Sequence, residues 1–304
     1  MLYYILKRAM LLLSKRPIAN VQKLGRFLGR LFWRLSRSRR NVAIINAQII
    51  GAADPIKTAK LSFEHTFCTY LESSYTHKVD REFIERYVAY EGKQHYDNLI
   101  EKGERFAILT AHLGSWELAA QVIPTLYGFK ALVAGRAAKI HSVEKAIRWM
   151  RNVGSVVYIS DRYIEKLSEY ERRGYYSASL LDHGGTASDS VLAPFFGYKV
   201  YTLAGLCAMC VRRKIPMLPC YLLRTENGFK AITHPPIYPE KVEGDRKSRI
   251  TMMAAQVNRE YEKIIQQFPE QWYLLHRRFK RIEENGKISK RIYQKRANPL
   301  KILS

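Results

Sequence analysis

The sequence has few cysteines for its length, and none forms an evident disulfide or metal-binding pattern. The 304 residues contain Cys68, Cys207, Cys210 and Cys220. Cys207-Ala-Met-Cys210 is formally a CxxC, but it has no second CxxC and its apolar surroundings predict a helix. The cysteines are therefore interpreted as small buried hydrophobic residues, with no metal site expected.

Long apolar runs and a secretory signal with a small-residue cleavage site are also missing. A membrane-spanning helix needs about 18 consecutive apolar residues. Residues 3–13 come closest, but Lys7 and Arg8 interrupt them. No membrane-spanning helix is therefore predicted. The few cysteines make a reducing, cytoplasmic environment the default expectation for this chain.

Acidic residues are absent before Asp54. Residues 1–53 hold eleven Lys and Arg, and residues 277–304 hold ten against two acids, so +19 of the formal net charge of +24 lies at the two ends. Such charge predicts an anionic partner. A nucleic-acid-binding protein would spread basic and aromatic residues over an exposed sheet or groove, and no recognition motif occurs. Lipid is therefore the expected partner, and nucleic acid is not.

Residues 21–35 have the pattern of a basic amphipathic helix. Apolar side chains recur at helical spacing on one side, and basic ones fall on the other. This composition is typical of a helix lying in a lipid interface, so residues 1–53 are predicted to form a membrane-associating arm. The alternative is that the apolar face docks on the protein's own core. The apolar positions are Val21, Leu24, Phe27, Leu28, Leu31, Phe32 and Leu35, and the basic ones are Lys23, Arg26, Arg30 and Arg34.

Short apolar runs alternate with helical patterns after residue 105. This alternation predicts an α/β core with a mixed central sheet flanked by helices, over residues 54–282, followed by a basic tail at 283–304. Ligands of such sheets bind beyond the carboxyl ends of the strands. The expected strands are 106–111, 130–134, 155–159, 177–181, 217–223 and 229–233, and the expected helices are 115–123, 142–152, 164–172 and 202–213.

His112 and Glu117 are the residues most suited to chemistry. His112 follows a predicted strand, Gly114 gives the turn backbone freedom, and Ser115 is a plausible helix N-cap. Glu117 would then lie in the first helical turn, from which it could fold back to the imidazole. A carboxylate on one ring nitrogen would leave the other to accept a proton from a hydroxyl. A capping glutamate beside an unrelated histidine would have the same spacing.

The motif His112-Leu-Gly-Ser-Trp-Glu117 resembles the HX4D/E motif of glycerolipid acyltransferases, in particular the lipid A biosynthesis lauroyl/myristoyl acyltransferase family. Further stretches are similar to that family in order and spacing, so the resemblance covers nearly the whole chain. They are LGRLFWRLSRSRRNVAIINAQIIG, LLDH at 180–183, VLAPFFG at 191–197 and FPEQWYLLHRRFK at 268–280.

The resemblance implies acyl transfer from an acyl carrier protein, or from acyl-CoA, to a hydroxyl of a lipid A precursor. The cytoplasmic face of the inner membrane is the implied location, no cofactor is implied, and His112 and Glu117 are the implied catalytic residues. The resemblance assigns substrate-binding roles to Arg136, Arg151, Asp182 and His183. Gly135-Arg136-Ala137 lacks the flanking Tyr and Pro common in the family, which leaves the acceptor and the acyl chain length open.

Two alternatives share part of this pattern. A glycerol-3-phosphate or lysophospholipid acyltransferase would use the same pair of residues, but is not expected to carry the 268–280 stretch. A catalytically silent membrane-surface scaffold would not need His112 and Glu117. Within 268–280, Trp272, Leu275 and Phe279 are predicted to pack the core while the basic residues face solvent or lipid phosphate.

Overall fold

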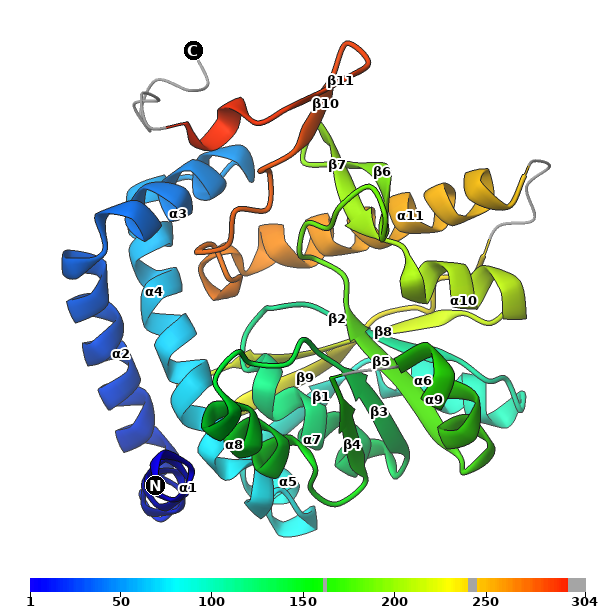
Figure 1. The fold of residues 1–304 in the computed structure, drawn as a ribbon. Helices are drawn as coiled ribbons and strands as arrows, with labels where there is room; N and C mark the ends of the chain where they lie inside the picture. The colour runs from blue at the N-terminus through cyan, green and yellow to red at the C-terminus, as the bar shows by residue number, and fades with distance from the viewer. Residues whose placement is uncertain (161–162, 240–244, 295–304) are drawn as a thin grey trace.

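The computed structural model describes residues 1–160, 163–239 and 245–294. Figure 1 shows a central twisted sheet with helices on both of its faces, and a smaller sheet beyond the long helix α11. The α/β prediction with a mixed, helix-flanked sheet is confirmed. The strands of the central sheet are β1 (Val88–Glu91), β2 (Ala107–Thr110), β3 (Lys130–Ala134), β4 (Val156–Ile159), β5 (Tyr175–Leu180), β8 (Met217–Arg224) and β9 (Phe229–Thr233).

The central sheet has the order β1-β9-β8-β2-β5-β3-β4. Only the β8–β9 pair is antiparallel. Buried side chains alternate between the two faces, as the period of a strand requires. Leu109 packs toward helices α10 (Gly205–Arg213) and α11 (Arg246–Gln267), whereas Ile108 packs toward α7 (Trp116–Tyr127). The core therefore consists of two layers separated by the sheet.

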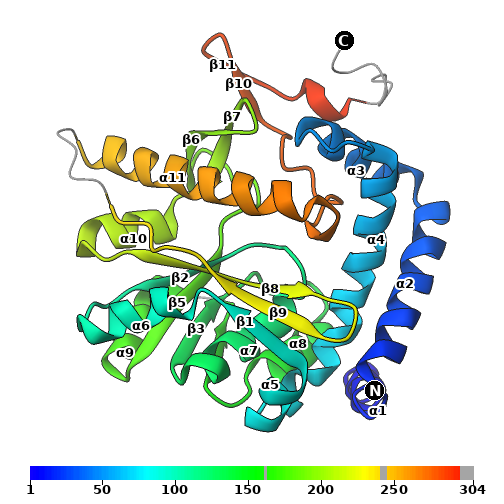
Figure 2. The ribbon, with the colours of Figure 1, turned by 180° about the vertical axis from the view of Figure 1, so that it is seen from behind.

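The other helices surround these layers, as the view from behind shows (Figure 2). In the part of the chain where strands and helices alternate, α8 and α9 begin and end within one residue of the predicted helices 142–152 and 164–172. Short 3-10 helices complete the set at η1 (Ser73–Lys78), η2 (Pro269–Gln271) and η3 (Arg291–Tyr293). The remaining α-helices are α1 (Leu2–Leu13), α2 (Ile18–Leu35), α3 (Arg37–Ile49), α4 (Pro55–Glu72), α5 (Arg81–Tyr87), α6 (Lys93–Glu101), α8 (His141–Arg151) and α9 (Tyr163–Arg172).

A second, antiparallel sheet was not predicted. It has the order β11-β10-β7-β6, formed by β6 (Ser190–Phe195), β7 (Tyr198–Leu203), β10 (Ile282–Glu284) and β11 (Lys287–Ser289). The prediction of a helix from residue 202 is wrong at its start, because 202 and 203 belong to β7. Phe196 and Gly197 both have positive φ, the turn that favours a two-residue hairpin. In the sequence, the pair Phe196-Gly197 was the available signal of this turn.

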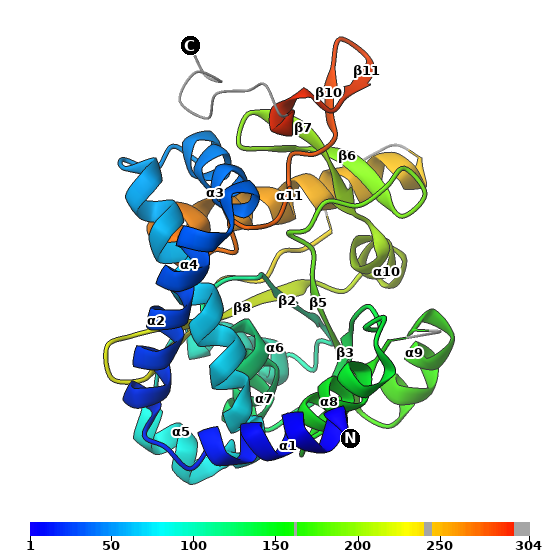
Figure 3. The same cartoon turned by 60° about the vertical axis from the view of Figure 1, so that its left-hand side comes forward.

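The predicted arm is helical, and α2 lies alongside α4 (Figure 3). A Cβ on Gly25 would lie 2.7 Å from the Cα of Cys68, and one on Gly29 would lie 2.5 Å from the Cα of Glu64. These glycines, four apart on one helix face, let the two backbones approach closely. The buried face of α2 therefore contains these glycines, and of the predicted apolar stripe it includes Val21.

That apolar stripe is exposed at Leu24, Phe27, Leu31 and Leu35, by between 40% and 73%. Within the described residues, no helix is both long and apolar enough to cross a membrane. The predicted tail 283–304 includes β11 and η3, while its last ten residues, 295–304, lie outside the described part. The division into arm, core and tail stays a prediction.

All four cysteines are buried, in keeping with their interpretation as small core residues. Trp272, Leu275 and Phe279 are buried as predicted; Trp272 forms an isolated bridge with Leu113, and the other two lie in turns. Arg278 corrects the expectation that the nearby basic residues face outward, because it is only 2% exposed. Its guanidinium donates to the Tyr201 carbonyl and lies over the Phe195 ring, which offsets part of its desolvation.

Candidate active site

His112 lies in a turn that follows β2 and precedes α7. Gly114 has φ of +62°, and a Cβ there would lie 2.2 Å from the Leu222 oxygen of β8. Only glycine fits this turn without displacing β8. Ser115 is the N-cap residue, as predicted, but its hydroxyl accepts no hydrogen bond from its own helix and instead donates to Glu72 of α4. The Tyr273 N–H donates to the His112 carbonyl at 2.9 Å. The turn is thus fixed from several sides.

Asp182 is the carboxylate that holds His112. Its Oδ1 lies 2.8 Å from His112 Nδ1, and its Oδ2 accepts the His112 backbone N–H at 3.0 Å. The sheet register explains this meeting: Thr110 of β2 is paired with Leu180 of parallel β5, and each catalytic candidate follows two residues later. The buried Tyr261 hydroxyl donates to the Thr110 carbonyl and accepts the N–H of Leu181, which joins the two strand ends.

The environment keeps the Asp182 carboxyl ionised. Burial by itself would raise its pKa, but His112, His183 and a hydrogen bond from Trp272 together hold the pKa below its usual range. Trp272 Nε1 donates to Oδ2 at 3.0 Å. Asp182 can therefore fix the proton on His112 Nδ1 and stabilise positive charge on the ring, which leaves Nε2 for proton transfer.

Glu117 does not serve His112 in this structure, contrary to the prediction. Its carboxylate forms a bidentate ion pair with Arg151 at the end of α8, with Nε–Oε2 at 2.9 Å and Nη2–Oε1 at 2.5 Å. Burial would lower the pKa of Arg151, but Glu117 raises it, so the guanidinium stays charged. The position at the imidazole that was predicted for Glu117 is taken by Asp182, which follows the predicted strand 177–181.

A deep cavity of about 1140 Å³ opens beside His112. Its inner part lies between α7 and the sheet, where the side chains are apolar. It is deep enough to take a long hydrocarbon group, with His112 next to the reacting end. The inner lining is formed by Ile108, Ala119, Ala120, Ile123, Pro124, Phe129, Ala131, Val133, Ala178 and Cys220.

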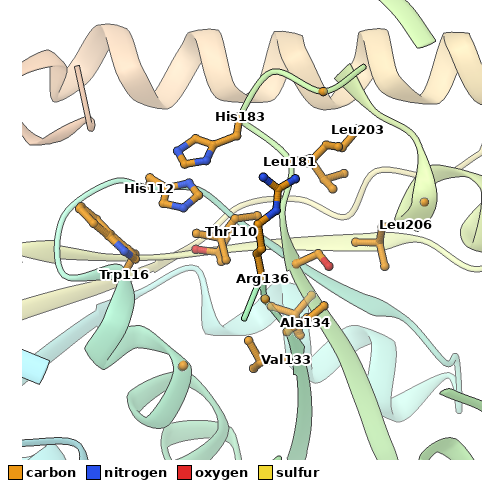
Figure 4. A pocket seen from close by; sticks show the side chains of 18 of the residues that line it. Thr110, His112, Trp116, Val133, Ala134, Arg136, Leu181, His183, Leu203 and Leu206 are labelled. Atoms are coloured by element: carbon orange, nitrogen blue, oxygen red, sulfur yellow. The ribbon is translucent and has the colours of Figure 1, made fainter. Parts of the chain in front are cut away.

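Basic side chains surround the outer part of the cavity. Arg136, in the segment after β3, is exposed and lines the cavity. Figure 4 shows its guanidinium on the same side as the rings of His112 and His183. The other basic side chains that line this part are Arg39, Arg277, Lys280 and Arg281. Such a rim suits an anionic substrate group.

The predicted site residues thus fall into three groups around one cavity. His112, Asp182 and His183 form one cluster, Glu117 and Arg151 form an ion pair, and Arg136 lies at the rim. The His183 ring stacks on that of His112, with centroids 3.6 Å apart. Sequence reasoning missed Tyr261 and the hydrogen bond from Trp272, because a buried aromatic residue gives no sign of its polar contact. In the described ranges, no cluster of three or more His, Cys, Asp or Glu side chains suits a metal ion.

An α/β sheet that holds a histidine–aspartate pair at an apolar cavity suits an enzyme that acts on a substrate with a long apolar group. Comparison with known families agrees. The chain belongs to the bacterial lipid A biosynthesis acyltransferase family, which it matches over residues 1–281. The family expectation from the sequence is confirmed.

Among solved structures, the chain is similar to the 1-acyl-sn-glycerophosphate (LPA) acyltransferase PlsC from Thermotoga maritima. The two share 17% sequence identity over 80% of this chain and 97% of that chain, with a TM-score of 0.35. No curated protein matches the chain significantly.

Proposed function

We propose that this protein transfers a fatty acyl chain from an acyl thioester to a hydroxyl of a lipid A precursor, with His112 as general base. The observation that carries the proposal is the position of His112: Nδ1 is held by the buried Asp182, and the ring lines the apolar cavity. No serine or cysteine nucleophile is needed, because the acceptor hydroxyl attacks the thioester directly.

The reaction then follows general acid–base chemistry. His112 Nε2 accepts the proton of the acceptor hydroxyl as its oxygen bonds to the thioester carbonyl carbon. Asp182 stabilises the imidazolium that forms. When the tetrahedral intermediate collapses, the C–S bond breaks and the imidazolium returns its proton to the leaving thiolate. Ester and thiol are the products, and the enzyme forms no covalent intermediate.

The remaining site residues have binding roles in this proposal. Arg136, exposed at the cavity rim, polarises the thioester carbonyl or holds a substrate phosphate. Arg151 is neutralised by Glu117, so the pair shapes the cavity wall more than it attracts an anion. The apolar inner cavity holds the acyl chain. The donor is an acyl carrier protein or CoA, either of which is acidic and complements the basic rim.

The proposed place of action is the cytoplasmic face of the inner membrane. The exposed apolar stripe of α2, with Phe27 exposed by 60%, lies beside basic residues such as Lys23 and Arg30, which are also exposed. A basic helix of this kind binds at the lipid interface without spanning it. The arm would thus keep the cavity close to lipid substrates.

Point substitutions test the membrane contact better than deletion of the arm, because Gln22 of α2 donates to the buried Glu72 and deletion would damage the core. Leu31→Ser should weaken co-sedimentation with anionic vesicles by about tenfold, from lost apolar burial. Ile100→Ser is the matched control, since Leu31 and Ile100 are exposed by 42% and 45%. Equal binding of both variants and the wild type would remove the membrane proposal.

Lipid mass spectrometry tests the function itself. Cells that carry the wild-type gene should contain a lipid A precursor heavier by one acyl group, and cells carrying His112→Ala should lack it. The purified variant should remain folded and lose about 10²–10⁴-fold in turnover. An added acyl group on a glycerophospholipid instead would identify the alternative activity, and a folded His112→Ala enzyme of normal activity would contradict the base assignment.

A further inference from the structure

Three imidazole rings form a column that begins at the catalytic base. The His183 ring lies on the His112 ring with centroids 3.6 Å apart and planes 3° apart. His276 lies on the other face of His183, at 4.0 Å and 16°. Figure 4 shows His183 directly above His112. The three rings come from three separate segments, so the column is a product of the tertiary fold.

The middle ring of the column is held neutral. Burial lowers the pKa of His183 to about 2, with further lowering by His112 and, more weakly, by His276 and Arg278. Burial also lowers the pKa of His276, to about 4. His183 Nε2 is buried and has no hydrogen-bond partner among the described residues. His183 therefore presents an uncharged ring face to His112 at neutral pH.

The stacking geometry suits a charged His112 better than a neutral one. Two neutral aromatic rings prefer offset or edge-on packing to a face-to-face sandwich. A cation over the face of a neutral ring is attracted to it, and the attraction grows when the pair is removed from water. In the proposed reaction, His112 becomes positively charged when it takes the acceptor's proton. The sandwich thus favours the ring state that forms during the reaction.

Proton transfer along the column does not explain this arrangement. Imidazole N–H bonds lie in the ring plane, and the planes of His112 and His183 are nearly parallel, so neither nitrogen points at the other ring's nitrogens. Phosphate binding by His183 is also disfavoured, because its neutral ring has a buried Nε2. The predicted substrate-binding role of His183 is therefore replaced by a role that acts through His112.

We propose that His183 is a positioning residue whose neutral ring face fixes the plane of the His112 ring and stabilises its imidazolium during acyl transfer. The proposal rests on the proposed function of His112 as the general base. His276 supports the outer face of His183, and Asp182 fixes the edge of His112. The column and the carboxylate thus restrain the base in two perpendicular directions.

The charged and titratable groups around the column come from every neighbouring element. Asp182 lies on the loop of His183, and the segment after η2 supplies Tyr273 and Arg278. Trp116 of α7 packs edge-on to His112 at 5.6 Å. From α3, Arg39 acts on His276. Glu117 and Arg136 also line the cavity. The cations oppose protonation of His183 and Asp182 favours it. Variants that test His183 should therefore leave these groups unchanged.

Ring substitution at His183 tests the proposal. His183→Phe keeps a neutral ring face, and His183→Ala removes it. NMR titration of the His112 ring, with histidine-labelled protein, should show its midpoint about 0.5–1.5 pH units lower in His183→Ala than in the wild type and nearly unchanged in His183→Phe. His141→Phe, at an exposed histidine outside the cavity lining, is the control and should leave the titration unchanged.

The rate profile supplies an independent readout. The acid limb of kcat/KM should move to lower pH in His183→Ala, and its plateau should fall by roughly 5- to 30-fold. His183→Phe should retain most of the rate. An unmoved titration midpoint in folded His183→Ala, or a Phe variant as impaired as the Ala variant, would overturn the proposal. If the wild type turns over no acyl thioester, the proposed function fails, while the titration still decides the role of His183.

Discussion

Two carboxylate pairs line the same cavity but are built for different tasks. Asp182 contacts only one side of the His112 imidazole, through Nδ1 and the backbone N–H. Glu117 instead engages the Arg151 guanidinium through both oxygens. In the first pair the carboxylate contacts the imidazole at Nδ1, whereas in the second pair the carboxylate and the guanidinium engage each other through two hydrogen bonds. Only the first pair is arranged for the proposed proton transfer.

The origins of the two pairs differ as well. His112 and Asp182 are 70 residues apart and meet because β2 and β5 are neighbours in the sheet. Glu117 and Arg151 are 34 residues apart and meet where the first turn of α7 faces the end of α8. A short motif therefore pointed to His112 as the proposed base but not to the carboxylate that contacts it.

Among these variants, Asp182→Asn should have the largest effect and should best distinguish the two pairs. The amide keeps the size of the side chain but removes the charge that stabilises the imidazolium, and it can bind the wrong tautomer of His112. We expect turnover to fall about 10²–10³-fold with little change in KM. Steady-state kinetics on a folded variant would measure this. A fall smaller than that of Glu117→Gln would reverse the assignment of the two pairs.

Glu117→Gln should act mainly on stability and substrate affinity. Loss of the carboxylate leaves the largely buried Arg151 without its charged partner, at a cost of about 1–3 kcal/mol. Urea unfolding should show this loss, and KM should rise more than kcat falls. Arg151→Met combined with Glu117→Gln should recover part of the stability, since no unpaired charge remains. A kcat loss of 10²-fold or more with unchanged stability would instead assign Glu117 to the chemistry.

The remaining prediction is an acid sensitivity to which the histidines around the first pair contribute. Folding depresses the pKa of His183 from 6.5 to about 2 and that of His276 to about 4. Below pH 6.5 the unfolded chain binds protons that the folded protein excludes, so stability is full above that pH and falls below it. Each histidine contributes a slope of about 1.4 kcal/mol per pH unit at most.

Unfolding midpoints at pH 7.5, 6.0 and 5.0 would measure this slope. His183→Phe should make the slope of stability against pH shallower. Glu117→Gln should lower the stability at every pH but leave the slope unchanged, because Arg151 does not titrate in this range. The same slope in wild type and His183→Phe would show that His183 is not excluded from protonation.

The alternation of strands and helices was predictable because each element carries its own period. Strands β3 and β9 begin and end where the apolar runs do. The β6–β7 hairpin was missed because Pro194 interrupts the apolar stretch of β6, as an edge strand allows, and β7 alternates buried and partly exposed side chains rather than forming an apolar run. Local pattern thus gave six of the seven strands of the central sheet, but not β1 or the second sheet.

The face that α2 buries shows a similar limit. Hydrophobicity alone offers the stripe containing Leu24 and Leu31 as the core-facing side, yet the structure leaves it exposed. Gly25 and Gly29 are buried instead, because close backbone approach to α4 requires the absence of a side chain. Packing distance, and not hydropathy, determined the orientation of this helix.

The sequence by itself determined the α/β alternation, the place of His112 at a strand end, the basic amphipathic arm and the family. These depend on neighbours within a few positions or on motifs in order along the chain. Only the tertiary structure decided that Asp182 rather than Glu117 holds the His112 ring, that His183 stacks on that ring, and that His276 stacks on His183. Sheet order and helix docking bring distant segments within hydrogen-bonding distance, and no local spacing records which distant segments will meet.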